Sequence, residues 1–180
     1  EHRFPCDFHR AMADGGWIGI AIPEQYGGGG RGILEAATVL QTVAASGAAM
    51  NGASSLHMSI FGMQPVIRHG DEAMRRRYLP DVADGSLHVA FGVTEPDAGT
   101  DTTRITTRAV RDGDHYVING RKVWTSKAME ADRILLLTRT TPLAECRRPT
   151  DGMTLFLVDK HAPGVGVAPI PKMGRNAVAS

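Results

Sequence analysis

Residues 91–101 read Phe-Gly-Val-Thr-Glu-Pro-Asp-Ala-Gly-Thr-Asp and join a strand-like start to a polar end rich in small residues. Pro96 lacks a backbone donor, so we expect the strand to end there. The hydroxyls of Thr94 and Thr100 can hydrogen-bond a ligand, and Gly99 lets the backbone approach one closely. The segment indicates a site for the polar edge of a cofactor. Taken alone, the segment favours an acidic β-turn that binds nothing, and the cofactor site depends on a second segment.

A second candidate segment, residues 122–126, reads Lys-Val-Trp-Thr-Ser. The ring of Trp124 can pack on a flat heterocycle, and the hydroxyls of Thr125 and Ser126 can donate hydrogen bonds to its nitrogens and oxygens. The alternative interpretation is a tryptophan that only fills the core of a sheet.

A glycine run at residues 27–32 formally satisfies the GxGxxG pattern of dinucleotide-binding folds. That fold needs an acidic residue roughly 20 positions further on to hold the ribose. No Asp or Glu occurs between Glu35 and Asp71, and no alternating strand–helix pattern follows. We therefore interpret the run as a turn that leads into the next helix.

Composition excludes several classes of protein. The net charge is +1, from 20 Lys and Arg against 19 Asp and Glu, which gives no basic field for nucleic acid. Cys6 and Cys146 lack metal-ligand spacing and are too few for a disulfide framework, so we expect no metal site and a cytoplasmic location. No uninterrupted apolar run reaches the roughly 18 residues that span a bilayer, so we expect no membrane insertion.

The first half of the chain has helical patterning. Apolar residues recur at spacings of three and four from about Gly32 to Gly85, with a proline interruption at Pro65. A further helix is predicted to begin at residues 71–72, whose acids suit a helix N-terminus, and Pro80 predicts a break within it.

The second half is patterned as short strands. Turn residues separate them, and 112–114 and 119–120 are hairpin signals, while 140–151 is expected to be an exposed hairpin loop. Helices first and strands second predict an α+β fold with an antiparallel β-barrel or sandwich. We divide the chain into a helical domain at 1–85 and a β domain at 86–180. The predicted strands are 88–93, 108–111, 115–118, 133–138 and 153–158.

Taken together, these motifs resemble the acyl-CoA dehydrogenase family. Residues 92–101 match its Thr-Glu-Pro…Ala-Gly-Thr-Asp signature, and 113–120 match the turn that precedes its second signature. Residues 124–126 match the Trp-x-Ser/Thr signature itself, and 19–28 match a Pro-Glu-x-x-Gly-Gly loop. The resemblance covers essentially the whole chain and implies FAD as cofactor.

The resemblance assigns roles residue by residue. The first signature would hold the pyrimidine side of the flavin and the FAD pyrophosphate, and Thr100 would also lie near acyl-CoA. Trp124 would pack on the isoalloxazine, and Ser126 would donate to flavin N5, with Thr125 between them. Glu95 is interpreted as structural. The first-signature residues concerned are Phe91, Val93, Thr94, Gly99 and Thr100.

The implied reaction is α,β-dehydrogenation of an acyl-CoA thioester, with hydride transfer to N5. The family's catalytic glutamate lies in a C-terminal helical domain, and no glutamate of this chain matches it, so we assign no catalytic residue and expect this piece alone to be inactive.

The chain lacks an initiator Met, so sequence is expected to be missing on both sides. Implied partners are an electron-transferring flavoprotein and further copies in a dimer or tetramer.

Two departures from the family pattern suggest a divergent substrate pocket. Arg104 stands where a small residue is usual, and 125–127 read Thr-Ser-Lys instead of the commoner Ile-Thr-Asn. Lys127 either approaches a phosphate or is solvated, and we favour the solvated state. The alternative functions are a flavin-dependent oxidase or monooxygenase of the same fold, and a non-catalytic assembly subunit.

Overall fold

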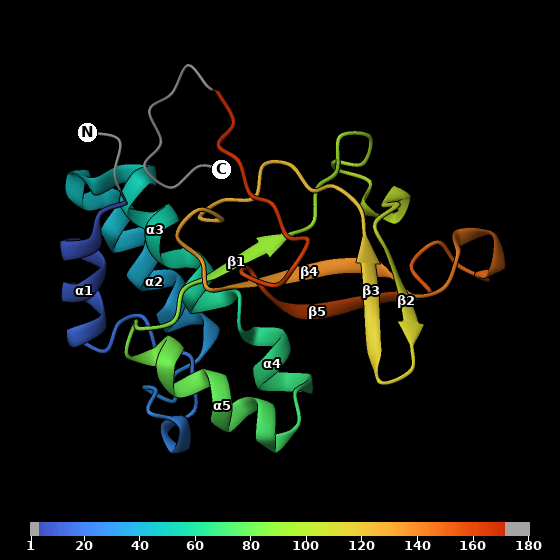
Figure 1. The fold of residues 1–180 in the computed structure, drawn as a ribbon. Coiled ribbons are helices and arrows are strands. Elements are labelled where there is room, and N and C mark those ends of the chain that lie inside the picture. Colours follow the sequence, from blue (N-terminus) through green and yellow to red (C-terminus); the bar gives the residue numbers. More distant parts are fainter. Residues whose placement is uncertain (1–3, 172–180) are drawn as a thin grey trace.

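The computed structural model describes residues 4–171, and the chain ends on which the expectation of missing sequence rests lie outside that range. A layer of helices packs against one edge and face of a five-stranded sheet (Figure 1). The predicted α+β class is confirmed. The helices are α1 (Cys6–Asp14), η1 (Glu24–Tyr26), α2 (Ile33–Val43), the π-helical η2 (Ala44–Ala48), α3 (Ala49–Phe61), α4 (Gln64–His69) and α5 (Glu72–Ala83).

The helix boundaries follow the local sequence signals. Asp71 caps α5, because its Oδ1 accepts a hydrogen bond from the backbone N–H of Met74 at 2.7 Å. Pro65 lies in the first turn of α4, where a missing N–H costs nothing. The predicted break at Pro80 is wrong, because α5 continues through it to Ala83. Pro80 removes one helical hydrogen bond, but Val82 and Ala83 beyond it are buried in the core, and this packing holds the last turn helical.

One helical stretch, 33–69, is long and apolar enough to cross a membrane by length and composition. The sequence expectation missed it, because it counted uninterrupted apolar residues and this stretch mixes aliphatic residues with Ala, Gly and Ser. The stretch is not one regular helix, since Gly47 within η2 has a φ of 90°. Leu56 and Ile60 of α3 are buried in the core of the helical layer, whereas only 11% of the candidate 18-residue window is buried inside the protein.

The five predicted strands are all present, each within about one residue of the expected bounds. β4 is the centre of the sheet: β5 pairs with it antiparallel along its full length, and β1 pairs with it parallel. β2 and β3 form an antiparallel hairpin that joins β4 through Arg108 and Arg139. The strands are β1 (Val89–Gly92), β2 (Arg108–Asp112), β3 (His115–Asn119), β4 (Arg133–Arg139) and β5 (Met153–Asp159), with short 3-10 turns η3 (Thr102–Arg104) and η4 (Leu143–Glu145).

Two details of the β prediction change. The sheet is mixed rather than wholly antiparallel, because the chain between β1 and β4 is long enough to return to the same end and run parallel. Residues 119–120 do not form a hairpin. Gly120 is instead a point of close approach, since a Cβ there would lie 2.3 Å from Thr107 Oγ1. The turn at 112–114 and the loop at 140–151 connect antiparallel strands as predicted.

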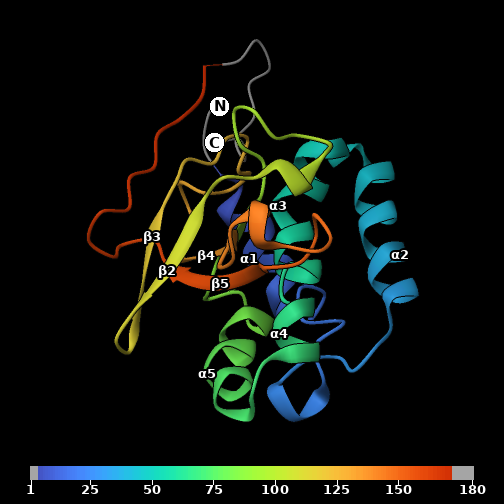
Figure 2. The same ribbon diagram turned by 90° about the vertical axis from the view of Figure 1, so that its right-hand side faces the viewer.

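The two layers share a hydrophobic core. Met63 and Leu79 of the helical layer are fully buried against Val89 of β1 and Leu135 of β4. Each such side chain contributes about 1.5–3 kcal/mol by its burial. Figure 1 shows β1 beside the helices, and Figure 2 shows, after a quarter turn, the β2–β3 hairpin lying to one side of them. This arrangement leaves the ends of β1 and β3, which carry the two candidate segments, free to meet.

Candidate functional site

The first candidate segment, which we call the proline loop (residues 93–101), follows β1 directly. Glu95 and Ala98 close it into a tight turn, because the backbone N–H of each donates to the carbonyl of the other, at 2.9 and 3.2 Å. Ala98 is buried and anchors the turn, whereas Gly99 and Thr100 are exposed beyond it. No protein atom lies within 4 Å of a Cβ built on Gly99. The backbone there is open to a ligand.

The carboxylate of Glu95 holds the proline loop to residues 106–107 and to Lys122. Its Oε2 accepts from the backbone N–H and the hydroxyl of Thr106, both at 2.7 Å, and its Oε1 accepts from the Thr107 N–H at 2.9 Å. Oε1 also accepts from Lys122 Nζ at 2.9 Å. Burial alone would raise the pKa of Glu95, but the hydrogen bonds from Thr107, Lys122 and Thr106 together lower it to about 2. The group is a buried structural anion, as the sequence predicted.

The second candidate segment, which we call the tryptophan loop (residues 122–127), is joined to the proline loop at three points. Lys122 Nζ donates to the Val93 carbonyl at 2.9 Å and to Glu95, and the Val123 N–H donates to the Thr94 carbonyl at 2.9 Å. Trp124 follows directly after this junction. The two loops therefore converge, although their motifs are separated in sequence.

The junction presents the side chain of Trp124 at the surface. Its backbone is left-handed, with a φ of 59°, and 59% of the residue is exposed. A left-handed backbone at a bulky residue typically costs about 1–3 kcal/mol, and an exposed indole forgoes the gain from burial. A residue that is costly in both respects is best explained by a ligand on which the ring packs. Thr125 and Ser126 follow it and are half-buried.

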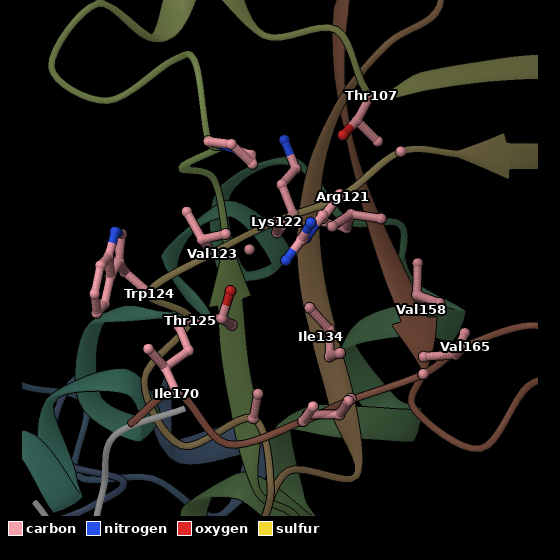
Figure 3. Close-up of a pocket in the computed structure, with 18 of the residues that line it drawn as sticks. Thr107, Arg121, Lys122, Val123, Trp124, Thr125, Ile134, Val158, Val165 and Ile170 are labelled. Carbon is pink, nitrogen blue, oxygen red and sulfur yellow. The ribbon is translucent and has the colours of Figure 1, made fainter. Parts of the chain in front are cut away.

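A cavity of about 770 Å³ lies beside the junction (Figure 3). Gly92 and Pro96 from the first segment and Trp124 and Thr125 from the second share its wall. Its charged lining groups are Arg121 and Lys122; Glu95 neutralises Lys122, so Arg121 is the cation that suits an anion or an electron-rich ring edge. The remaining described lining includes Thr107, Ile118, Gly120, Val123, Ala128, Ile134, Leu136, Val158 and residues 164–171.

The predicted residues separate into two groups. Trp124 and Thr125 line the cavity, whereas Val93 and Thr94 take part in the junction through their carbonyls. One of the others lies in β1 and the rest lie on the same two loops; all are outside the cavity wall, and their cofactor roles stay predictions. These are Phe91, Gly99, Thr100 and Ser126.

Sequence reasoning missed three features of the site. The first is the ion pair between Glu95 and Lys122, which the opposite charges of these two residues on the two short motifs could have indicated. The second is Thr107, for which no sequence signal exists. Its Oγ1 is buried on the cavity wall without a hydrogen-bond partner among residues 4–171. The third is Lys127, for which we favoured a solvated side chain. It is fully buried, because the chain turns it into the helical layer, where Ser59 meets it.

The residues present fit a flavin. The exposed indole offers a flat apolar face, Gly99 leaves open space, and Arg121 on the lining suits the electron-rich edge or the phosphates of FAD. Among residues 4–171, no group of three or more His, Cys, Asp or Glu side chains is arranged to hold a metal ion.

Comparison with known proteins gives consistent matches over the chain. Residues 1–86 match the family described as acyl-CoA dehydrogenase, N-terminal domain, and residues 90–180 match acyl-CoA dehydrogenase, middle domain. The acyl-CoA dehydrogenase FadE26 of Mycobacterium tuberculosis is 36% identical over 163 residues, which cover 90% of this chain and 40% of that protein. The chain thus spans about two fifths of that relative's length.

Solved structures agree with these matches. A probable acyl-CoA dehydrogenase from Mycobacterium abscessus superposes with a TM-score of 0.87 at 30% identity, over 99% of this chain and 46% of that one. The prolyl acyl carrier protein oxidase AnaB superposes with a TM-score of 0.85 at 28% identity, over 99% of this chain and 47% of that one.

Proposed function

The chain belongs to the acyl-CoA dehydrogenase family, and we propose that it forms the flavin-holding part of an FAD-dependent enzyme that dehydrogenates an acyl-CoA thioester between Cα and Cβ. One observation carries the proposal. The proline loop and the tryptophan loop meet through Lys122 and Val123 and place an exposed indole beside a cavity.

The chain's own residues would bind and orient the cofactor. Trp124 would stack on the isoalloxazine, and the hydroxyls of Thr125 and Ser126 would donate to its polar edge. Gly99 and Thr100 would admit the pyrophosphate, and Thr100 would also contact the acyl-CoA. Phe91, Val93 and Thr94 would complete the binding surface.

When bound, FAD supplies a hydride acceptor at N5. A donor from the tryptophan loop would stabilise the charge that develops on the reduced ring, which is the usual function of a preorganised hydrogen bond. Loss of one such bond to a charged group costs roughly 1.5–3 kcal/mol. The catalytic base is proposed to lie outside residues 1–180, as are further cofactor contacts. We also propose a cytoplasmic homo-oligomer that passes electrons to an electron-transferring flavoprotein.

The test uses the protein at its natural length. It should purify yellow and bleach anaerobically when a suitable member of an acyl-CoA panel is added. A colourless preparation that also fails to take up added FAD would overturn the proposal and favour a non-catalytic subunit. Rapid reoxidation by oxygen with release of hydrogen peroxide would assign an oxidase instead, a function named for one structural relative.

A further inference from the structure

Lys127 crosses from the tryptophan loop into the helical layer. It lies three residues after Trp124, its backbone is left-handed with a φ of 65°, and none of its surface is exposed. Its Nζ donates to Ser59 Oγ of α3 at 3.2 Å and lies 5.2 Å from the centroid of the Phe4 ring. The side chain therefore connects the loop to α3, which is 68 residues away in sequence.

The position of Lys127 is costly to the fold. Among residues 4–171, no carboxylate lies within ion-pair distance of its Nζ. Burial lowers the pKa of Lys127 to about 8, and the more distant carboxylates of Glu130 and Asp132 only partly oppose this shift. A left-handed backbone at a non-glycine residue adds strain. Stability therefore does not explain this lysine, and costly features of this kind concentrate at functional sites.

The other titratable groups around Lys127 give it no anionic partner. His9 of α1 stacks on His88 before β1, with ring centroids 4.4 Å apart. Burial, and then the charge of Lys127, lowers the pKa of His9 to about 3 and that of His88 to about 4. His57 of α3 is shifted downward as well, by burial and then by Lys127, against an opposing backbone hydrogen bond. With Arg10 also on this side, the direct contacts of the ammonium group within residues 4–171 are with Ser59 and the Phe4 ring.

We propose that Lys127 is a positioning residue that fastens the tryptophan loop to Ser59 of α3 and so fixes the backbone that presents Trp124 and Ser126 to the cofactor. We call this Lys127–Ser59 contact the latch, and its role in cofactor binding rests on the proposed flavin site. Its existence does not, because the loop can be observed without flavin.

The first test measures the motion of the loop itself. Trp17→Phe leaves Trp124 as the single tryptophan among residues 1–180, and with any tryptophan outside them also replaced by Phe, the time-resolved fluorescence anisotropy of Trp124 reports local order. Lys127→Met and Ser59→Ala should each enlarge the fast, disordered component. The double variant should show no larger change than either single variant, because both remove the same contact. Arg147→Met, which removes an exposed cation on the distant loop at 140–151, is the control and should change nothing.

The second test compares FAD affinity with stability at the protein's natural length. Lys127→Met removes a buried charge and is expected to fold with a melting temperature equal to or above that of the wild type. It should nevertheless bind FAD about 2- to 10-fold more weakly, the range given by one lost hydrogen bond. Ser59→Ala should weaken binding by a similar factor, again without additivity.

The outcomes separate the two proposals. Wild-type protein that binds no FAD contradicts the proposed function, while the anisotropy still decides whether the latch exists. Wild-type affinity and anisotropy in Lys127→Met and Ser59→Ala contradict the latch even if flavin binds. Additive losses in the double variant would also overturn it, because they would show that the two side chains act independently.

Discussion

Individual residues at the junction show which roles can be inferred from sequence. Glu95 was predicted to be structural, and its four hydrogen-bond donors explain why an acid is needed there. Lys127 was predicted to be solvated and is buried, because the residue that receives it, Ser59, lies on a distant helix. Chemical type and spacing within a motif indicate local roles. They carry no information on which remote side chain will cover a residue.

Replacing Glu95 with Gln should destabilise the protein by about 3 kcal/mol, because Lys122 loses its buried partner and one acceptor oxygen becomes a donor facing Thr106. Since the pKa of Glu95 falls from its usual 4.5 to about 2, its contribution is complete above pH 4.5 and is lost as the pH falls through 2. Urea unfolding from pH 7 to pH 2 measures this. A variant with wild-type stability at pH 7 would show that the carboxylate does not hold the loops.

Two glycine substitutions should separate cofactor binding from folding. Gly99→Ala places a methyl in open space at an ordinary φ, so the melting temperature should stay unchanged while FAD affinity falls. Gly113→Ala also meets no neighbour but has a φ of 58°, so it should cost about 1–2 kcal/mol of stability without altering FAD affinity. Thermal melts and FAD titrations of both variants provide the comparison. Unchanged FAD affinity in Gly99→Ala would place the cofactor elsewhere.

Helices and strands were predicted better than their pairing. Periodicity and turn residues located every strand, because these signals are local. The parallel pairing of β1 with β4 was missed, because it depends on where the intervening chain returns. Gly120 was misassigned to a hairpin, although glycine is needed there only because Thr107 of a neighbouring segment lies so close.

The docking of α1 should be sensitive to acid. His9 and His88 have folded pKa values of about 3 and 4, below the usual 6.5, so the unfolded chain binds protons first as the pH falls. Stability is therefore retained above pH 6.5 and lost progressively towards pH 4, by about 2 kcal/mol per histidine at pH 5. Melting temperatures from pH 7.5 to pH 4.5 measure the slope. His9→Phe should flatten it, and an unchanged slope would contradict this account.

For the molecule as a whole, the helical layer acts as a base that orients one end of the sheet. The shared core holds β1 and β4 in place, and the two loops extend from strand ends on that rigid support (Figure 1). The sequence predicted both loops and the α+β class, because the motifs are contiguous and specific. It could not predict the three contacts that join the loops, since these arise only when the fold brings together the segments that follow β1 and β3, two strands that are not neighbours in the sheet.

The central claim is that the proline loop and the tryptophan loop hold one flavin between them. The most direct measurement is a titration with FAD of the natural-length apoprotein in which every tryptophan except Trp124 is replaced with Phe, followed by the fluorescence of Trp124. We predict saturable quenching at one FAD per chain, with a weaker apparent affinity when Gly99→Ala is added. Fluorescence that stays constant while FAD binds, or quenching that Gly99→Ala leaves unaltered, would contradict it.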